Sequence, residues 1–568
     1  MTATKMATPA GDGPGAEFAG ALDMILTTPT RRTASRILPG KTGVRVTGSL
    51  ARRPRVLATS GLEYAAELTR VARGTSNLTA SPKDRRFADP AWKGNPFLRR
   101  VLQSYLATAR AAERLVAETA LEWRDAQRAR FAVDNLLEAA APSNNPLLNP
   151  AAWKAAIDTG GLSLVRGARN LVGDLSSAPR VPAMVDESAF CVGENLAVTP
   201  GSVVLRTEIL ELIQYRPQTE TVHQRPVLIV PPTINKFYVL DLAAGRSMVD
   251  YLVQQGQQVF VISWRNPDAR HSGWGTDAYG QAVLDAVDAV EAITATDKTL
   301  LTGICSGGIL ASMVMGHLAA TGSDERIAGV GLAVTLLDQS RAGLGGALLD
   351  DNTAAAAVAA SKARGYLDGR ALAEVFAWLR PSDLVWNYWV NNYLLGKKPP
   401  AFDILFWNAD TTRMTAALHR DFVSLAVNNG ITEGTARMLG TEVDLRKVMT
   451  DNYVVAAVSD HICPWQACYA STQLLGGHSR FVLSSGGHIA AMVNPPGNRK
   501  ANFLTADNTP ALTTDWKQGA ATHEGSWWPD FDRWLADRAG GLKPAPVELG
   551  SATYPAMELA PGTYVFDS

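Results

Sequence analysis

An α/β fold with a parallel sheet covered by helices is predicted by three observations. Short apolar runs of strand length alternate with amphipathic helical stretches from residue 227 onward. A long helical segment precedes them, and one glycine-flanked turn, Gly303–Gly307, joins an apolar run to a helix. Parallel strands buried on both faces are apolar throughout, which is the pattern seen here.

The first 200 residues are predicted to form a helical N-terminal region. Residues 1–60 look loosely structured, with a small, polar start rich in Gly and Pro. From Phe97 to Ala140 the chain is rich in Ala, Leu, Arg and Glu, with apolar residues at helical spacing. Pro142–Pro150 interrupts this pattern, and Leu162–Leu175 is amphipathic again.

The first part of the sheet is expected in residues 201–340. The predicted strands are Val227–Val230, Val259–Trp264, Thr299–Ile304 and Val330–Leu337. The predicted helices between them are Ala243–Gln255, Asp277–Ile293 and Gly307–Ala320. The pattern resumes in residues 447–568, where we predict the strand Tyr453–Val458, the helix Trp465–Leu475 and the strand Arg480–Ser485.

Residues 341–446 lack this alternation. Their sequence pattern is typical of helices, and they contain many aromatic residues. The aromatics include Trp378, Trp386, Tyr388, Trp389, Tyr393, Phe406 and Trp407. An insertion between two late strands of such a sheet is where a cap over the site would lie. A plain packing subdomain is the alternative.

Composition excludes several classes of function. Lys+Arg and Asp+Glu both total 54, so the formal net charge is zero. Nucleic acid as the main partner is not expected, because phosphate binding needs a basic surplus. A hydrophobic content of 46% allows a sizeable core.

Cysteine usage and the apolar pattern predict a cytoplasmic protein. The four cysteines, Cys191, Cys305, Cys463 and Cys468, are too few for a disulfide framework and lack the paired spacing of a zinc site. No export signal precedes the helical region, and no uninterrupted apolar run is long enough to span a membrane.

The segment Gly303-Ile304-Cys305-Ser306-Gly307 follows a predicted strand and opens a predicted helix. This is the context of the nucleophile elbow of the α/β-hydrolase fold, with Cys305 in place of serine. A thiol ionises more readily than a hydroxyl and exchanges with thioesters, so Cys305 suits acyl groups that arrive as thioesters. A buried structural cysteine in a glycine-rich turn is the alternative.

In this fold the acid and then the histidine follow the nucleophile along the chain. His488 lies just past the last predicted strand, and Asp460 ends the strand before it. Asp460 would fix the tautomer of His488, which would act as the base. Asp338, after the strand Val330–Leu337, is a rival acid, and His461 beside Asp460 is a rival base.

The oxyanion hole would use the backbone N–H of Ser306 and one N–H from the loop after the first predicted strand. Prolines in that loop cannot donate, which leaves Thr233 or Ile234. We see no metal cluster, phosphate-binding loop or dinucleotide fingerprint, so neither a metal nor a cofactor is expected.

From about residue 80 to its end, the sequence resembles the polyhydroxyalkanoate synthases of class I and class II. The matching segments are the cysteine box Gly303–Gly307, Asp84–Phe87, Pro232–Asp241, Ser263–Pro267, Trp386–Tyr393, Asp460–Trp465, Gly487–Ile489, Asn494–Pro496 and Ser526–Trp528. The segments Phe402–Asn408 and Pro561–Val565 favour class II.

The resemblance implies an acyltransferase that polymerises (R)-3-hydroxyacyl-CoA into storage polyester and releases CoA. Cys305 would carry the acyl group, His488 would activate it, and the acid matching Asp460 would help His488 to activate the 3-hydroxyl of the incoming unit. It also implies a homodimer on cytoplasmic polyester granules, with dimer and granule contacts in the helical N-terminal region and a cap that opens for substrate. A thioesterase or depolymerase of the same fold, and a silent granule-coat protein, remain alternatives.

Overall fold

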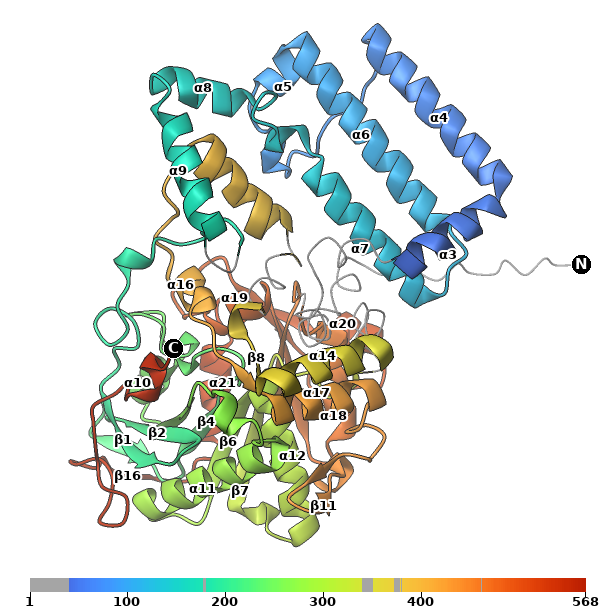
Figure 1. Ribbon diagram of the computed structural model, residues 1–568. Helices are drawn as coiled ribbons and strands as arrows, with labels where there is room; N and C mark the ends of the chain where they lie inside the picture. The colour runs from blue at the N-terminus through green and yellow to red at the C-terminus, as the bar shows by residue number, and fades with distance from the viewer. Residues whose placement is uncertain (1–39, 177–179, 340–350, 372–377, 379–380, 461) are drawn as a thin grey trace, which may run out of the picture.

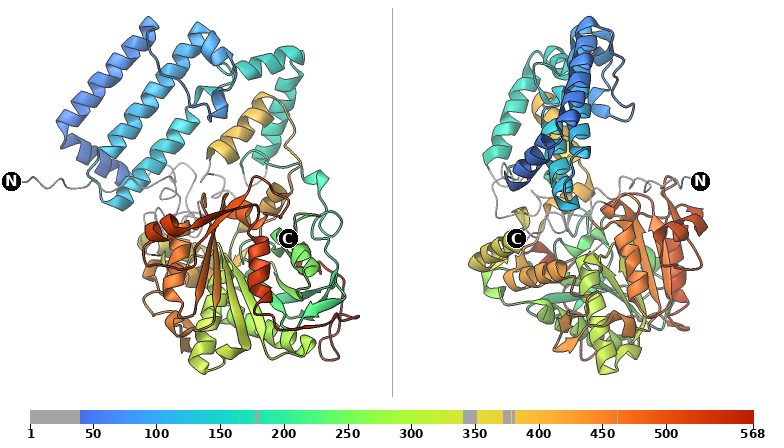
Figure 2. Two further views of the ribbon diagram at one scale, coloured as in Figure 1. Left: turned by 180° about the vertical axis from the view of Figure 1, so that it is seen from behind. Right: turned by 90° about the vertical axis from the view of Figure 1, so that its right-hand side faces the viewer.

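The computed structural model describes residues 40–568 except 177–179, 340–350, 372–377, 379–380 and 461 (Figure 1). A layer of helices from the N-terminal part lies on one side of a body built around a large sheet, as Figures 1 and 2 show from three directions. No helix in these described ranges is both long enough and apolar enough to cross a membrane.

The described part of the N-terminal region is mainly helical. Its main helices are α3 (Gly40–Ala51), α4 (Pro54–Arg73), α6 (Pro96–Ala117), α7 (Trp123–Ala139), α8 (Pro150–Asp158) and α9 (Leu162–Ser176). Proline at the first position and an asparagine cap begin α6 and α8, where Asn95 and Asn149 accept hydrogen bonds from backbone amides. The expectation of loose structure to residue 60 is wrong for residues 40–60, most of which lie in α3 and α4. These helices were missed because glycines and arginines interrupt their apolar pattern.

Ten strands form one mixed sheet in the order β1-β2-β5-β4-β6-β7-β12-β13-β14-β15. The six central strands, from β5 to β13 in that order, run parallel. They are β4 (Val227–Val230), β5 (Val259–Trp264), β6 (Thr299–Ile304), β7 (Ile327–Ala333), β12 (Asn452–Ala457) and β13 (Ser479–Ser484). The predicted α/β-hydrolase fold class is therefore confirmed. Three of these strands, β4, β5 and β6, have the predicted bounds, and β12 and β13 are shifted by one residue.

The strand predicted as Val330–Leu337 is corrected to Ile327–Ala333. Val334 has a φ of 44°, which ends the extended backbone, so Asp338 lies in a loop and not at the end of the strand. The helix predicted from Ala243 begins only at Met248, because Gly245 has a φ of 72° and Ser247 caps the helix.

Antiparallel strands that were not predicted extend both edges of the sheet. They are β1 (Gly201–Arg206) and β2 (Leu210–Tyr215) at one edge, and β14 (Asn502–Thr505) and β15 (Ala521–Glu524) at the other. Polar residues hide β2 in the sequence, since its buried Glu211 and Gln214 interrupt the apolar run. Glu211 accepts hydrogen bonds from the backbone amides of Thr563 and Tyr564.

Helices cover both faces of the sheet and make two cores. One core includes residues of α11 (Thr276–Thr294), α12 (Ser306–Thr321) and α18 (Trp465–Leu474). The other includes residues of α10 (Met248–Gln254) and α21 (Trp528–Ala536). The parallel strands are buried on both faces, as their apolar sequences require.

The segment between β7 and β12 is largely helical and contacts the N-terminal region. It contains α14 (Asp351–Arg364), two π-helical segments (Ser382–Trp386 and Trp389–Leu394), α16 (Asp403–Ala409) and α17 (Ala416–Asn428). The Trp389 indole donates to the carbonyl of Asn144 at 3.0 Å, and the Tyr393 hydroxyl donates to Asp174 at 2.7 Å. Trp389 and Tyr393 therefore connect the inserted segment with the N-terminal region.

Candidate active site

Cys305 lies on a sharp turn between β6 and α12. Its φ of 52° and ψ of −120° are strained for a residue with a side chain, and such strain is typical of a nucleophile elbow. The side chain is buried, with 8% of its surface exposed. The start of α12 adds the positive end of a helix dipole, which favours a thiolate at Cys305.

The glycines around Cys305 are needed for close approach of the backbone. A Cβ at Gly303 would lie 2.5 Å from the Cα of Gly308, and one at Gly307 would collide with the carbonyl oxygen of Val230. Any other residue at these positions would force β6, β4 and α12 apart.

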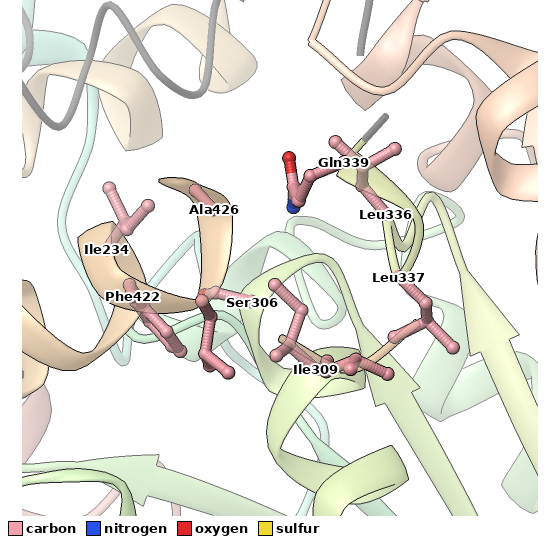
Figure 3. A pocket seen from close by; sticks show the side chains of 10 residues that line it. Ile234, Ser306, Ile309, Leu336, Leu337, Gln339, Phe422 and Ala426 are labelled. Atoms are coloured by element: carbon pink, nitrogen blue, oxygen red, sulfur yellow. The ribbon is translucent and has the colours of Figure 1, made fainter. Parts of the chain in front are cut away.

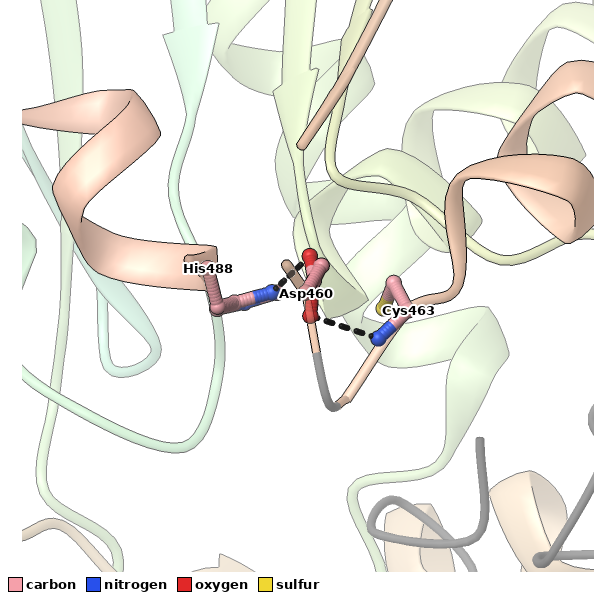
Figure 4. Close-up of side chains that lie close together, drawn as sticks. All are labelled: Asp460, Cys463 and His488. Carbon is pink, nitrogen blue, oxygen red and sulfur yellow. Dashed lines mark hydrogen bonds and ion pairs between the residues drawn. The ribbon is translucent and has the colours of Figure 1, made fainter. Parts of the chain in front are cut away.

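His488 and Asp460 form a buried pair (Figure 4). His488 is also hydrogen-bonded to Cys305. His488 begins α19 (His488–Met492), which follows β13, and its Nδ1 lies 2.7 Å from Asp460 Oδ2. The other carboxylate oxygen of Asp460 accepts from the backbone N–H groups of Ile462 and Cys463, at 2.8 and 2.9 Å. These bonds hold the carboxylate, which in turn orients the imidazole so that Nε2 is left for Cys305.

Burial and the charge of Asp460 shift the pKa of His488 in opposite directions. Burial alone would lower the pKa of His488, but the charge of Asp460 and hydrogen bonds with Asp460 and Cys305 raise it to about 10. The neighbouring Cys463 thiol and burial raise the pKa of Cys305 well above its usual value, against the opposing effect of His488. The three groups can therefore pass a proton between Cys305 and His488 while Asp460 stabilises the imidazolium.

The structure places the rival acid, Asp338, away from His488. The Asn429 amide donates to Asp338 at 3.0 Å, and Asp460 is the acid that contacts His488. His461 lies outside the described residues. Four of the other histidines make local side-chain contacts, His271 with Asp268, His317 with Thr441, His419 with Ser361, and His523 with Thr505.

The loop after β4 carries the two candidate amides of the oxyanion hole, those of Thr233 and Ile234. The backbone N–H of Thr233 donates to Ser306 Oγ at 2.9 Å, so the Ser306 hydroxyl already engages that amide. Ile234 lies with Ser306 on the wall of an apolar pocket (Figure 3). The oxyanion role of the Ile234 and Ser306 amides stays a prediction.

Sequence reasoning missed Lys236, which anchors the same loop. Its ammonium is buried and donates to the carbonyls of Val565 and Asp567, at 2.7 and 2.6 Å. The Trp407 indole donates to the carbonyl of Lys236 at 2.7 Å. The end of the chain and the inserted segment therefore both hold the loop that carries Thr233 and Ile234.

The pocket beside Ser306 is small and apolar. Its wall is formed by Ile234, Ser306, Ile309, Leu336, Leu337, Gln339, Phe422, Leu425, Ala426 and Ile431 (Figure 3). Its free volume of about 20 Å³ has room for about one water molecule. Phe422 and its neighbours come from α17, so movement of the inserted segment would enlarge it.

Comparisons with known proteins agree on one family. A family model described as the N-terminus of poly-beta-hydroxybutyrate polymerase (PhaC) matches residues 83–252, and one described as the alpha/beta hydrolase fold matches residues 226–495. Poly(3-hydroxyalkanoate) polymerase 2 of Ectopseudomonas oleovorans is 47% identical over 508 residues, which cover 89% of this chain and 90% of that protein. The poly(3-hydroxyalkanoate) polymerase subunit PhaC of Cupriavidus necator is 40% identical over 511 residues, covering 89% and 86%.

Proposed function

The chain belongs to the poly(3-hydroxyalkanoate) polymerase family and is an acyltransferase, and we propose that it polymerises 3-hydroxyacyl-CoA through a thioester on Cys305. The observation that carries this proposal is the buried contact of His488 with Asp460 beside a cysteine on a strained strand-to-helix turn. Neither a cofactor nor a metal is needed for the steps below.

The acylation step begins when Nε2 of His488 takes the proton of the Cys305 thiol. The thiolate attacks the thioester carbonyl of the substrate, and the N–H groups of Ser306 and Ile234 stabilise the oxyanion. The C–S bond to CoA breaks, and the CoA sulfur leaves with the proton held by His488. Asp460 keeps the imidazole oriented and stabilises its charged form.

Chain extension uses the same residues on the 3-hydroxyl of the next unit. His488 takes the hydroxyl proton, and the oxygen attacks the acyl group on Cys305. An ester bond forms, the Cys305 thiolate leaves, and the proton of His488 returns to the sulfur. The extended chain is then a CoA thioester, which acylates Cys305 again by the first step and releases CoA. Each cycle therefore adds one unit and releases one CoA.

We propose a class II preference for medium chain length, with the aliphatic side chain of the substrate in the apolar pocket after movement of the inserted segment has enlarged it. Rates of CoA release should rise from 3-hydroxybutyryl-CoA to 3-hydroxyoctanoyl-CoA, by about tenfold or more for burial of several methylenes. The measurement is CoA release across the series, with the insoluble product weighed. Free hydroxy acid without polymer would instead indicate a thioesterase, and no CoA release from any substrate would contradict the proposal.

We propose that α8 and α9 contact the polyester granule. Their outer faces expose large apolar residues, with exposed fractions from 51% to 76% for Trp153, Ile157, Leu162, Leu164, Val165, Val172 and Leu175. The inner face of α9 instead carries small residues, since Gly167 packs against the backbone of Tyr393. Exposed apolar side chains gathered on two neighbouring helices support contact with an apolar surface.

Replacing Ile157, Val165 and Val172 by glutamate should reduce the fraction of protein that sediments with polyester particles by about tenfold or more. The reason is that three buried charges would oppose the contact. Val547→Glu is the control, because Val547 is 87% exposed and lies outside the helical region. Equal sedimentation of the triple variant and the control would refute the role of α8 and α9.

Other properties of this chain are proposals that rest on the family. They are a homodimeric state, a cytoplasmic location on granules, and a division into a helical region (1–200), a sheet domain in two parts (201–340 and 447–568) and a cap (341–446).

A further inference from the structure

Cys463 is a second buried thiol at the candidate active site. It lies on the loop after β12, just before α18, and is 1% exposed. Its backbone N–H donates to Asp460 at 2.9 Å, and its thiol contacts that of Cys305. A carboxylate oxygen of Asp460, the sulfur of Cys463 and a ring nitrogen of His488 all lie within 4.8 Å of one another (Figure 4).

We propose that Cys305, Cys463 and His488 bind a thiophilic divalent cation such as Zn²⁺, and that the bound cation blocks the nucleophile. Zn²⁺ binds cysteine sulfur and histidine nitrogen, and three protein ligands with one open position are a common set. Ligand atoms of a tetrahedral zinc site lie about 3.5–4 Å apart. A ring nitrogen of His488 lies within 4.8 Å of the Cys463 sulfur, so small side-chain movements would bring these two groups to ligand spacing.

Asp460 is not one of the proposed ligands, but it holds His488 in position. It contacts Nδ1 of His488 at 2.7 Å, which leaves Nε2 as the metal ligand. A metal-bound histidine usually donates its other ring N–H to a carboxylate in this way, which fixes the ring and strengthens the ligand. The same pair that would orient His488 for catalysis is therefore also arranged for a metal.

Binding involves no oxidation. The cation forms bonds to the two sulfurs and to Nε2, and the protons held by these atoms leave to solvent. The Cys305 sulfur is then committed to the metal and cannot attack a thioester, and His488 cannot accept a proton at Nε2. Chelation of the metal reverses both effects, so inhibition is reversible.

Co²⁺ titration of the intact, metal-free protein tests the site directly. We expect one site with thiolate-to-cobalt charge-transfer bands and the visible bands of tetrahedral Co²⁺, both removed by Zn²⁺. Cys463→Ser should weaken Co²⁺ binding by about 100-fold or more. Loss of a residue that only holds a ligand in place already costs about 10–100-fold, and Cys463 is itself a proposed ligand. Cys468→Ala, which removes another buried thiol, and Cys191→Ser, which removes an exposed one, should keep the bands.

Two further measurements complete the test, and the first of them needs neither a variant nor polymerisation. Zn²⁺ should slow alkylation of both Cys305 and Cys463 by iodoacetamide in the wild-type protein, as read by peptide mass spectrometry. Zn²⁺ should also stop CoA release, with recovery on addition of EDTA, each variant being compared with its own metal-free rate. Absence of the thiolate bands in the wild type, alkylation unaffected by Zn²⁺, or equal binding by Cys463→Ser would overturn the proposal.

Discussion

Cys305→Ala should abolish CoA release from every 3-hydroxyacyl-CoA, with a loss of about 10⁶-fold, the scale seen when the nucleophile of a comparable triad is removed. The structure gives the reason, because Cys305 is the side chain raised on the elbow and the one that contacts His488. Steady-state CoA release with a thiol reagent measures the effect.

The matched control for this variant is Cys468→Ala, which removes a buried thiol of the same size from α18. It should fold and release CoA at a rate close to that of the wild-type protein. Activity retained by Cys305→Ala, or lost equally in both variants, would be incompatible with Cys305 as the nucleophile.

Asp460→Asn should lower the rate of CoA release by about 10²–10⁴-fold and move the acid side of the pH–rate profile. His488 must lose its extra proton before it can accept that of Cys305, so activity rises with pH. Asp460 helps to raise the pKa of His488 to about 10, so the acid limb of the wild-type profile should lie above the usual histidine value. Without the carboxylate charge the pKa of His488 falls, and the limb should move to lower pH.

Profiles of kcat/KM against pH for the two proteins measure this shift, with Asp338→Asn as the control. Asp338 contacts Asn429 of the inserted segment, so its replacement should leave the position of the limb unchanged. If the acid limb moved in Asp338→Asn and stayed in place in Asp460→Asn, Asp338 and not Asp460 would be the acid that acts on His488.

The centre of the fold could be predicted from the sequence because its strands are buried on both faces. Thr299–Ile304 and Val259–Trp264 have the predicted bounds, since unbroken apolar runs leave little ambiguity. The edges could not be predicted in the same way, because β2 buries Glu211 and pairs its charge with Arg206. A buried carboxylate paired with a partly exposed arginine is invisible to a pattern based on apolar residues alone.

The main candidate residues could be predicted from chain order and strand ends, and the structure brings Cys305, His488 and Asp460 together. What could not be predicted depends on loop geometry. The use of the Thr233 amide by the Ser306 hydroxyl requires the packing of the β4 loop against α12. The approach of Cys463 to Cys305 likewise depends on the turn around Asp460, because 158 positions separate the two cysteines (463 − 305).

Mass spectrometry of the protein quenched during turnover tests the covalent mechanism most directly. The proposal predicts that a hydroxyacyl or oligoester mass is added to the peptide containing Cys305, that it is released by a competing thiol, and that His488→Gln greatly slows its formation. Acyl groups found only on Cys463, or full polymer synthesis with no acyl group on any cysteine, would contradict the assignment of Cys305.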